Sequence, residues 1–135
     1  KAKSALDGVP HGLPALLRAN KLQLKAAKVG FDWDDIAPVW DKVAEELTEL
    51  REAVQSGMPA KIEDELGDVV FAVVNLGRFL GVEAEVALNG TNNKFIRRFQ
   101  QVEAAIRAQG RKWQELDLAQ MEELWQAAKA GEKKN

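Results

Sequence analysis

The sequence predicts an all-α protein with about five helices and a four-helix-bundle-like packing. There is no sustained alternation of apolar and polar residues between turn signals, and there is no tyrosine, so strand signals are nearly absent. Apolar residues instead recur at steps of three and four along most of the chain. Proline and glycine stand near the points where these stretches begin and end.

The first predicted helix covers residues 13–28, with Pro14 in its first turn and Gly30 beyond its end. The second begins after "FDWDD", whose aspartates are candidate N-caps, and ends near "SGMP". Its apolar stripe predicts one buried face, made of Ile36, Val39, Trp40, Val43, Leu47, Leu50 and Val54.

The third predicted helix begins after Pro59 and stops at Gly81. Its main stripe is Ile62, Leu66, Val69, Val73, Leu76 and Leu80. Four further apolar residues fall outside that stripe, namely Val70, Phe71, Val74 and Phe79. A helix that is apolar nearly all round is central or lies at a subunit interface. We therefore expect a homodimer or higher homo-oligomer whose third and fourth helices meet a twofold mate.

A fourth helix is predicted over residues 83–108 and a short last one over residues 117–129. The fourth carries Phe95, Phe99, Val102 and Ile106 on one line. A chain of 135 residues is long enough for one domain with a real core, so we expect a single domain over residues 1–135.

Composition excludes several classes of function. The chain has no cysteine, which rules out disulfides, thiol nucleophiles and thiolate metal sites and makes the reducing cytoplasm the expected location. No apolar run approaches the roughly 20 residues that span a bilayer, so no membrane partner is expected. The formal charge of −2 gives no general attraction to nucleic acid.

Two acidic motifs carry the chemistry, "EELTE" at residues 45–49 and "ELGD" at residues 65–68. Glu46 falls about 80° from the centre of its helix stripe, and Glu65 and Asp68 fall about 60° and 120° from theirs, so all three approach apolar surface. The short connection between the two helices makes them antiparallel neighbours. Glu46 and Glu49 can then face Glu65 and Asp68.

Converging carboxylates beside a core are unfavourable unless a cation joins them. Mg²⁺ is the natural candidate, because it takes oxygen ligands and completes its shell with water and substrate phosphates. Zinc fits poorly, since the only histidine is His11, and a di-iron site needs Glu-x-x-His pairs that these helices lack. The competing interpretation is that these acids simply solvate exposed helix faces.

Basic and aromatic residues supply a second set of candidates. Lys94 and Arg98 share one helix face in "NNKFIRRF", which suits phosphate oxygens, although ordinary surface charge is the alternative. Lys42 and Lys61 flank the acidic pairs. Three tryptophans near helix ends could stack a base, with packing as the alternative, namely Trp33, Trp113 and Trp125.

The quoted motifs together resemble the MazG nucleoside triphosphate pyrophosphohydrolases, particularly their C-terminal catalytic domain. "EELTE" and "ELGD" match the family's EExxE and ExxD signature, "NNKFIRRF" matches its basic block, and "LDGVPHGLPALLRANKLQLKAAKVGFDW" is similar to the family's first segment. The likeness covers nearly the whole chain. Family members are often tandem two-domain chains, so the C-terminal half of such a chain is one expectation.

The resemblance implies an all-α fold and hydrolysis of a nucleoside triphosphate to a monophosphate and pyrophosphate. It implies Mg²⁺, with Mn²⁺ as a substitute ion, held by Glu46, Glu49, Glu65 and Asp68. Glu45, the remaining acid, is a candidate general base or a group that supports the metal ligands, and with Glu46 and Glu49 it forms the expected catalytic set. The implied contacts to the nucleotide are Lys42, Lys61, Lys94, Arg98, Trp125 and Lys129.

Two other functions remain open at this point. The first is a non-catalytic helical dimerisation module, which would show no dependence on Mg²⁺. The second is another all-α pyrophosphohydrolase, of dUTPase-like or phosphoribosyl-ATP type, which would share the acidic pairs and differ in its base pocket.

Overall fold

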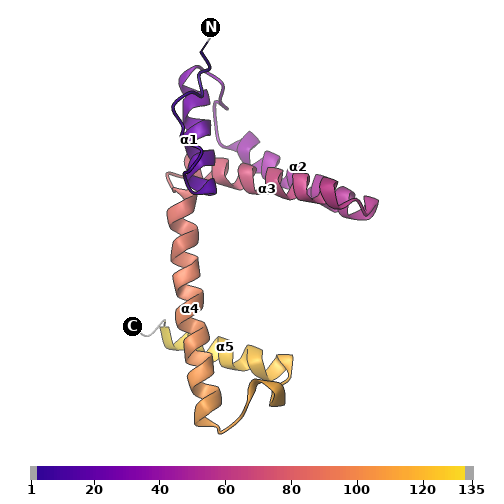
Figure 1. Ribbon diagram of the computed structural model, residues 1–135, viewed down its shortest axis with the longest axis vertical. Helices are drawn as coiled ribbons and strands as arrows, with labels where there is room; N and C mark the ends of the chain where they lie inside the picture. The colour runs from indigo at the N-terminus through magenta and orange to yellow at the C-terminus, as the bar shows by residue number, and fades with distance from the viewer. Residues whose placement is uncertain (1–2, 133–135) are drawn as a thin grey trace. The chain divides into compact units, whose positions relative to one another are not determined.

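The computed structural model describes residues 3–132, which form five α helices, one short 3₁₀ helix and no strand (Figure 1). The predicted all-α class is therefore confirmed. The elements are α1 (Ala15–Lys28), α2 (Ala37–Ser56), α3 (Pro59–Phe79), α4 (Ala84–Ala108), η1 (Trp113–Glu115) and α5 (Leu118–Glu132). Each predicted helix is present, with its ends within three residues of the expected ones.

The ends of α2 show why the boundaries were predictable. Asp35 accepts the Ala37 backbone N–H at 2.7 Å, so an aspartate of "FDWDD" satisfies a free donor of the first turn. Gly57 ends the helix with a left-handed φ of 70°, where a side chain would be strained. Pro59 then opens α3, where its missing N–H costs nothing.

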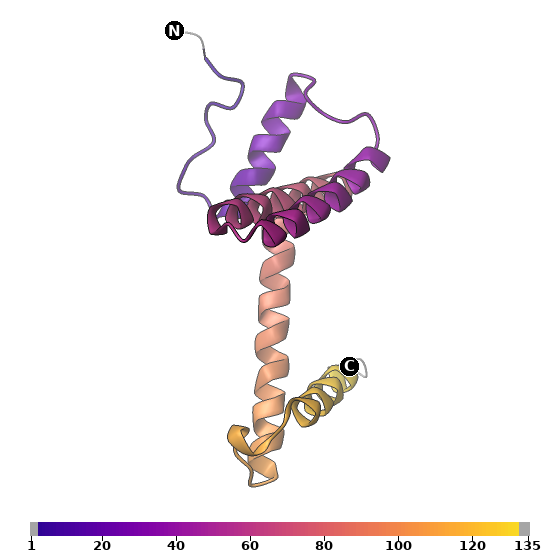
Figure 2. The same cartoon turned by 90° about the vertical axis from the view of Figure 1, so that its right-hand side faces the viewer.

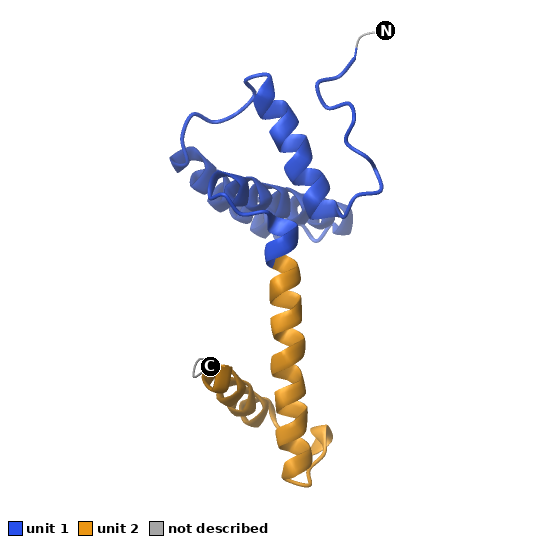
Figure 3. Ribbon diagram, turned by 90° about the vertical axis from the view of Figure 1, so that its left-hand side faces the viewer, with its two compact units in different colours: residues 1–87 blue, residues 88–135 orange. Residues whose placement is uncertain are grey.

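The chain divides into two compact units, Lys1–Ala87 and Leu88–Asn135, coloured separately in Figure 3. Unit 1 contains α1, α2, α3 and the first residues of α4. Unit 2 contains the rest of α4 together with η1 and α5. Neither unit alone holds four helices that could form a bundle, so bundle packing and the single domain stay predictions.

In unit 1, α2 and α3 lie side by side and antiparallel, as their short connection predicts (Figures 1 and 2). Helix α1 packs on α3, where Gln23, which is buried, donates its Nε2–H to the Phe71 carbonyl at 3.0 Å. The loop after α1 is tied to α3 by a two-pronged ion pair from Arg78 to Asp32, at 2.7 and 3.1 Å.

The buried face of α2 differs from the predicted one. Its most buried residues are Val39, Glu46 and Ala53, spaced by seven, with exposures of 1%, 6% and 2%. The neighbouring line of Trp40, Leu47 and Val54 is about half exposed, so the prediction that Trp40 packs in the core is wrong for the single chain. The physical reason is that α3 meets α2 on the side of Glu46, and one helix covers only part of a wide apolar stripe.

Helix α3 corrects a second expectation. Val74 lies outside the predicted stripe, yet it is 2% exposed, because α3 has neighbours on more than one side, namely α1 and α2. Three residues of the predicted stripe are instead half exposed, namely Leu66, Val73 and Leu80. Phe71 and Val70, also outside the stripe, remain open to solvent at 48% and 40%. Unit 1 thus keeps apolar surface on both α2 and α3.

Unit 2 has its own small core. Val102 and Ile106 of α4 and Leu116 are buried, with Trp113, Met121, Leu124, Trp125 and Ala128 packed against them. Aromatic rings line one side of this core, where Phe99 stacks on Trp113 at a centroid distance of 5.1 Å. Among residues 3–132, no helix combines the length and the apolar character needed to cross a membrane.

Candidate functional site

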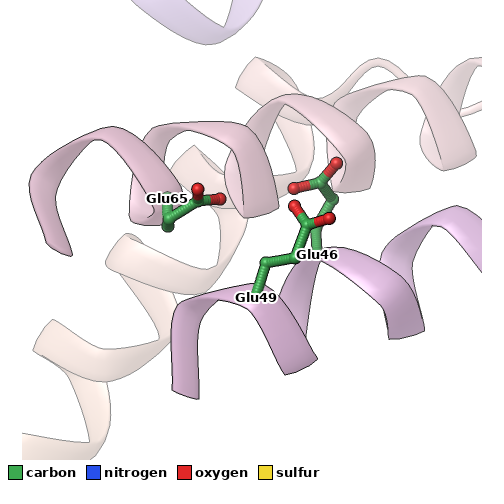
Figure 4. A group of neighbouring side chains, drawn as sticks. All are labelled: Glu46, Glu49 and Glu65. Carbon is green, nitrogen blue, oxygen red and sulfur yellow. The ribbon is translucent and has the colours of Figure 1, made fainter. Parts of the chain in front are cut away.

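Three carboxylates converge between α2 and α3. Glu46 and Glu49 extend from α2 and Glu65 from α3, and Figure 4 shows their carboxylate groups directed into the space between the two helices. One oxygen from each lies within 4.8 Å of the other two. Glu46 is 6% exposed and the other two are half buried, so the group lies at the edge of the core.

Helix geometry accounts for this convergence. A spacing of three puts Glu46 and Glu49 on neighbouring positions of one α2 face. Because Glu46 belongs to the line that packs on α3, both acids point toward that helix. Glu65 meets them because the two-residue connection at residues 57–58 runs α3 back along α2. The predicted facing of acidic pairs is therefore present for these three residues.

Asp68 belongs to a second group, which it forms with Asp64 and Glu65. Glu65 is common to both groups, whereas Asp68 is not among the three acids that meet between the helices. The predicted four-acid set is thus brought together only in part. Asp64 was missed by the sequence reasoning, although it stands four residues before Asp68 and so shares a helix face with it.

Mutual repulsion and burial disturb the titration of these acids. The neighbouring Glu46 carboxylate, through a hydrogen bond and its charge, raises the pKa of Glu49. Burial, helped by the charges of Asp68, Asp64 and Glu46, raises the pKa of Glu65. Burial, with the charges of Asp64 and Glu46, likewise raises the pKa of Asp68. All three shifts mean that the protein alone does not offset these negative charges.

Lysine side chains partly neutralise the negative charge of these acids. Lys42 Nζ lies 3.0 Å from Glu46 Oε1 and 3.6 Å from Glu45 Oε1, one turn along α2. The hydrogen bond with Glu46 is the main reason that the pKa of Lys42 is raised. Glu45 is exposed and lies outside the group of three, beside Lys42. Lys61 of α3 is exposed, and its charge acts on Glu65 by opposing the rise of that pKa.

Two carboxylate oxygens in the group have no partner. Glu46 Oε2 and Glu65 Oε2 are both buried and form no hydrogen bond within the part of the chain that the structure describes. An unsatisfied buried acceptor of this kind is costly, and more so when it is charged. Two such oxygens from facing helices fit the oxygen preference of a hard divalent cation such as Mg²⁺.

The other candidate residues belong to unit 2. Arg98 Nε donates to Glu132 Oε2 at 2.8 Å, and its guanidinium lies 5.9 Å from the ring of Trp125. Lys94 and Lys129 are half buried. Unit 2 also contains a cavity of about 250 Å³. It is lined by Phe95, Phe99, Val102, Trp113, Leu118, Met121, Glu122 and Trp125. Its aromatic walls could hold a flat apolar ring.

The raised pKa values predict how stability depends on pH without divalent cations. A carboxyl group whose pKa is raised by folding favours the native state at low pH, and this contribution is lost as pH rises through the folded pKa. Glu49→Gln should therefore raise the melting temperature more at about pH 7 than at about pH 4.5, the ordinary pKa of a glutamate side chain. Thermal melts of both proteins in metal-free buffer measure this difference. An equal effect at both pH values would mean that Glu49 is not under repulsion.

The fold and the site together define a class, that of helical proteins whose adjacent antiparallel helices present carboxylates able to hold a hard cation. Residues 38–103 match the MazG nucleotide pyrophosphohydrolase domain, a segment that contains both acidic groups and the basic block. The chain belongs to the MazG family, as the resemblance of its motifs indicated.

Known relatives agree with this assignment. The chain is 51% identical over 131 residues to a nucleoside triphosphate pyrophosphohydrolase of Escherichia coli K12, covering 96% of this chain and 50% of the relative. It is 40% identical over 132 residues to the nucleoside triphosphate pyrophosphohydrolase/pyrophosphatase MazG of Thermotoga maritima, covering 98% and 51%. It is also 44% identical over 134 residues to the uncharacterised protein YabN of Bacillus subtilis, covering 98% and 27%. The chain thus spans about half the length, or less, of these relatives.

Proposed function

We propose that this chain hydrolyses nucleoside triphosphates to nucleoside monophosphates and pyrophosphate with bound Mg²⁺, for which Mn²⁺ can substitute. The observation that carries the proposal is the pair of buried, partnerless oxygens of Glu46 and Glu65 on facing helices, within the described part of the chain. Two relatives that match nearly the whole chain are named nucleoside triphosphate pyrophosphohydrolases, which supports the choice of substrate.

In this proposal Glu46, Glu49 and Glu65 hold the ion from two helices, and Asp68 completes the set from the adjoining group. A bound Mg²⁺ polarises phosphoryl oxygens and lowers the pKa of water. The carboxylates fix its place, and their repulsion is relieved by binding it. Because Glu46 is buried at the α2–α3 contact, its carboxylate needs little reordering when the ion binds.

Three further residues of unit 1 have proposed roles in the reaction. Glu45 is exposed and lies on α2 next to the acidic group, so it is placed to accept the proton of the attacking water. Lys42 and Lys61 carry positive charge beside the acids and offset the charge of the triphosphate. As the water oxygen bonds to one of the two phosphorus atoms, the anhydride bond between the α- and β-phosphates breaks. Its electron pair stays on the bridging oxygen, which leaves with the other product.

Unit 2 carries the remaining proposed contacts to the nucleotide. Arg98 and Lys94 of α4 provide cations for phosphate oxygens, and Lys129 of α5 adds a third. Trp125, whose ring lies 5.3 Å from that of Phe95, provides a face for the base. The aromatic cavity beside them supports this assignment.

The test is turnover of a panel of nucleoside triphosphates by the purified chain, with and without Mg²⁺, followed by identification of the products. Monophosphate and pyrophosphate that form only with Mg²⁺ or Mn²⁺ are expected. Release of orthophosphate would overturn the reaction proposed here. Lack of turnover with any nucleotide, by a folded protein that Mg²⁺ does not stabilise, would favour a dimerisation module.

Lys94→Ala and Arg98→Ala should lower kcat/KM for the triphosphate by about ten- to a hundredfold, because a charge-assisted phosphate contact contributes roughly 1.5–3 kcal/mol. Arg98 also pairs with Glu132, so its loss affects unit 2 as well. Glu132→Gln is the matched control, since it breaks the same ion pair and keeps Arg98. Steady-state kinetics and thermal melting together separate a loss of phosphate binding from a loss of stability. Unchanged kcat/KM in both alanine variants would mean that Lys94 and Arg98 are ordinary surface charges.

The exposed apolar residues of α2 and α3 support a homodimer or higher homo-oligomer as part of the proposal. Trp40, Leu47 and Phe71 each keep about half of their surface open in one chain. Apolar side chains that are exposed on two adjacent helices are typical of an interaction site when they form one patch. Location in the cytoplasm stays a prediction.

A further inference from the structure

A second cavity lies in unit 1, between the segment before α1 and α1 itself. Its cavity measures about 340 Å³, within the range of small-molecule sites. The segment runs down to the start of α1, which then turns back beside it (Figure 2). We call it the lysine pocket, and it is lined by Gly8, Val9, Pro10, Leu13, Lys21, Leu24, Lys25 and Lys28.

All charged residues that line the lysine pocket are cations. Lys21, Lys25 and Lys28 stand at steps of four and three on one face of α1, and no carboxylate contributes to the lining. None of the three forms a salt bridge with any acid among residues 3–132. The two acids that flank the pocket in sequence have other partners, since Asp7 accepts the Ser4 backbone N–H at 3.1 Å and Asp32 pairs with Arg78.

Two of these lysines also stabilise α1 by their position at its end. Lys25 and Lys28 lie in the last turn of α1, where cations favourably meet the negative end of the helix dipole. The helix dipole does not account for Lys21, which lies a turn earlier. Nor does it account for the chain segment that lines the cavity with these lysines. Arg18 donates to His11 Nδ1 at 3.1 Å and so fastens this segment to α1.

Glycine permits the close approach of the segment. Gly8 has a φ of +91°, a conformation that other residues rarely adopt. A Cβ added there would lie 3.4 Å from the Lys25 Nζ, in van der Waals contact with the ammonium group. The backbone before α1 therefore passes close to the Lys25 ammonium group, which forms no salt bridge with any acid among residues 3–132.

We propose that the lysine pocket binds an oligophosphate, at a site separate from the carboxylates of α2 and α3. From Lys21 to Lys28 the helix rises about 10 Å, which suits a chain of linked phosphates better than a single tetrahedral anion. Lysine donates as a point charge to such oxygens, and the apolar wall formed by Leu13, Leu24 and Pro10 lowers the competition from water. None of its lining residues belongs to α2 or α3, which carry the carboxylates.

The site does not depend on the proposed catalytic function, and metal-free buffer separates the two. With divalent ions removed by a chelating resin, the acids of α2 and α3 repel anions, so binding there is suppressed. Isothermal titration calorimetry of the whole chain with tripolyphosphate, pyrophosphate and orthophosphate should give affinities that fall in that order. Affinity should also fall as salt is added, because the contacts are charged. If wild-type protein binds none of these anions, the proposal is overturned.

Substitutions of the lysines test whether the anion binds in the lysine pocket. Lys21→Ala and Lys25→Ala should each weaken tripolyphosphate binding about tenfold, and their combination more strongly, while circular dichroism stays helical because alanine favours helix. Arg51→Ala removes the same charge from an exposed position on α2 and should change affinity by less than about twofold. Glu49→Gln should retain binding. An equal loss in Arg51→Ala, or a loss confined to Lys94→Ala in unit 2, would contradict the assignment.

Adenosine triphosphate distinguishes two sources of the oligophosphate. Tighter binding than tripolyphosphate, with the difference removed by Leu24→Ala, identifies a nucleotide whose nucleoside rests on the apolar wall. Equal binding identifies an inorganic oligophosphate. Both results support an anion site in the lysine pocket, whereas adenosine triphosphate binding that survives Lys21→Ala/Lys25→Ala would overturn it.

Discussion

Glu49→Gln is expected to abolish turnover, by at least about a hundredfold, without loss of the helical fold. Glu49 is half buried and extends from α2 toward Glu46 and Glu65. Loss of one hard ligand removes charge and geometry from the proposed Mg²⁺ site, and disturbing such shells typically costs about 10- to 100-fold or more. Replacing a repelled carboxylate with an amide also leaves the metal-free protein at least as stable as wild type.

The measurement pairs kinetics with thermal melting across a Mg²⁺ series. Saturating Mg²⁺ at about 100 times its Kd should stabilise wild type by about 2.7 kcal/mol, and Glu49→Gln should lose this stabilisation together with turnover. Glu52→Gln is the matched control, since it makes the same change at an exposed position of α2. Normal turnover by Glu49→Gln would remove Glu49 from the site.

The same kinetic experiment distinguishes the roles of Asp64 and Asp68 in the second acidic group. Asp68→Asn should abolish turnover as Glu49→Gln does, whereas Asp64→Asn should lower it only modestly, because in the proposal Asp64 acts only through its charge on Glu65 and Asp68. The reverse order would assign the fourth ligand to Asp64.

Phe71→Glu is expected to dissociate the oligomer or to unfold the protein at micromolar concentration. Phe71 keeps 48% of its surface open in one chain, beside Val70 on the outer face of α3. If a twofold mate covers this face, the new carboxylate is buried without a partner, which costs several kcal/mol. Light scattering across a dilution series, with circular dichroism at each point, measures both outcomes.

Phe31→Glu is the matched control, because it makes the same change at a residue 82% exposed in the loop before α2. It should leave mass and fold unaltered. Val74→Glu, which the apolar pattern also suggests, is uninformative about assembly, because Val74 is already buried within the single chain. A folded wild-type monomer at micromolar concentration would contradict the oligomer.

Helix boundaries could be predicted because they are local. Pro59 and Gly57 act on the backbone within one turn, and their effect needs no knowledge of the rest of the fold. The buried faces could not be predicted as well. Periodicity reports which side of a helix is apolar, whereas burial depends on which side a neighbour covers. Trp40 is the clearest case, since it lies on the apolar stripe and is 53% exposed.

The candidate site shows the same division. Spacing and a short connection were enough to predict that Glu46, Glu49 and Glu65 meet, because both are local rules applied to two adjacent helices. The separation of Asp68 into a group with Asp64 depends on how far α3 is rotated against α2, which no local rule fixes. The tie from Arg78 to Asp32 joins residues 46 apart and has no signal in the spacing of either.

The line of Val39, Glu46 and Ala53 on α2 has a consequence for how the chain chooses its fold. A seven-residue repeat is the seam of a coiled coil, in which apolar residues alone tolerate sliding by a heptad. A single charged residue in the middle of such a seam removes that freedom, since any slipped alignment would press the Glu46 carboxylate against apolar side chains with nothing to bind. The acid proposed to hold the ion thus also disfavours slipped alignments of the two helices, in addition to the short connection between them. If Glu46 holds the ion as proposed, selection for catalysis and selection for correct pairing of α2 with α3 act on the same side chain.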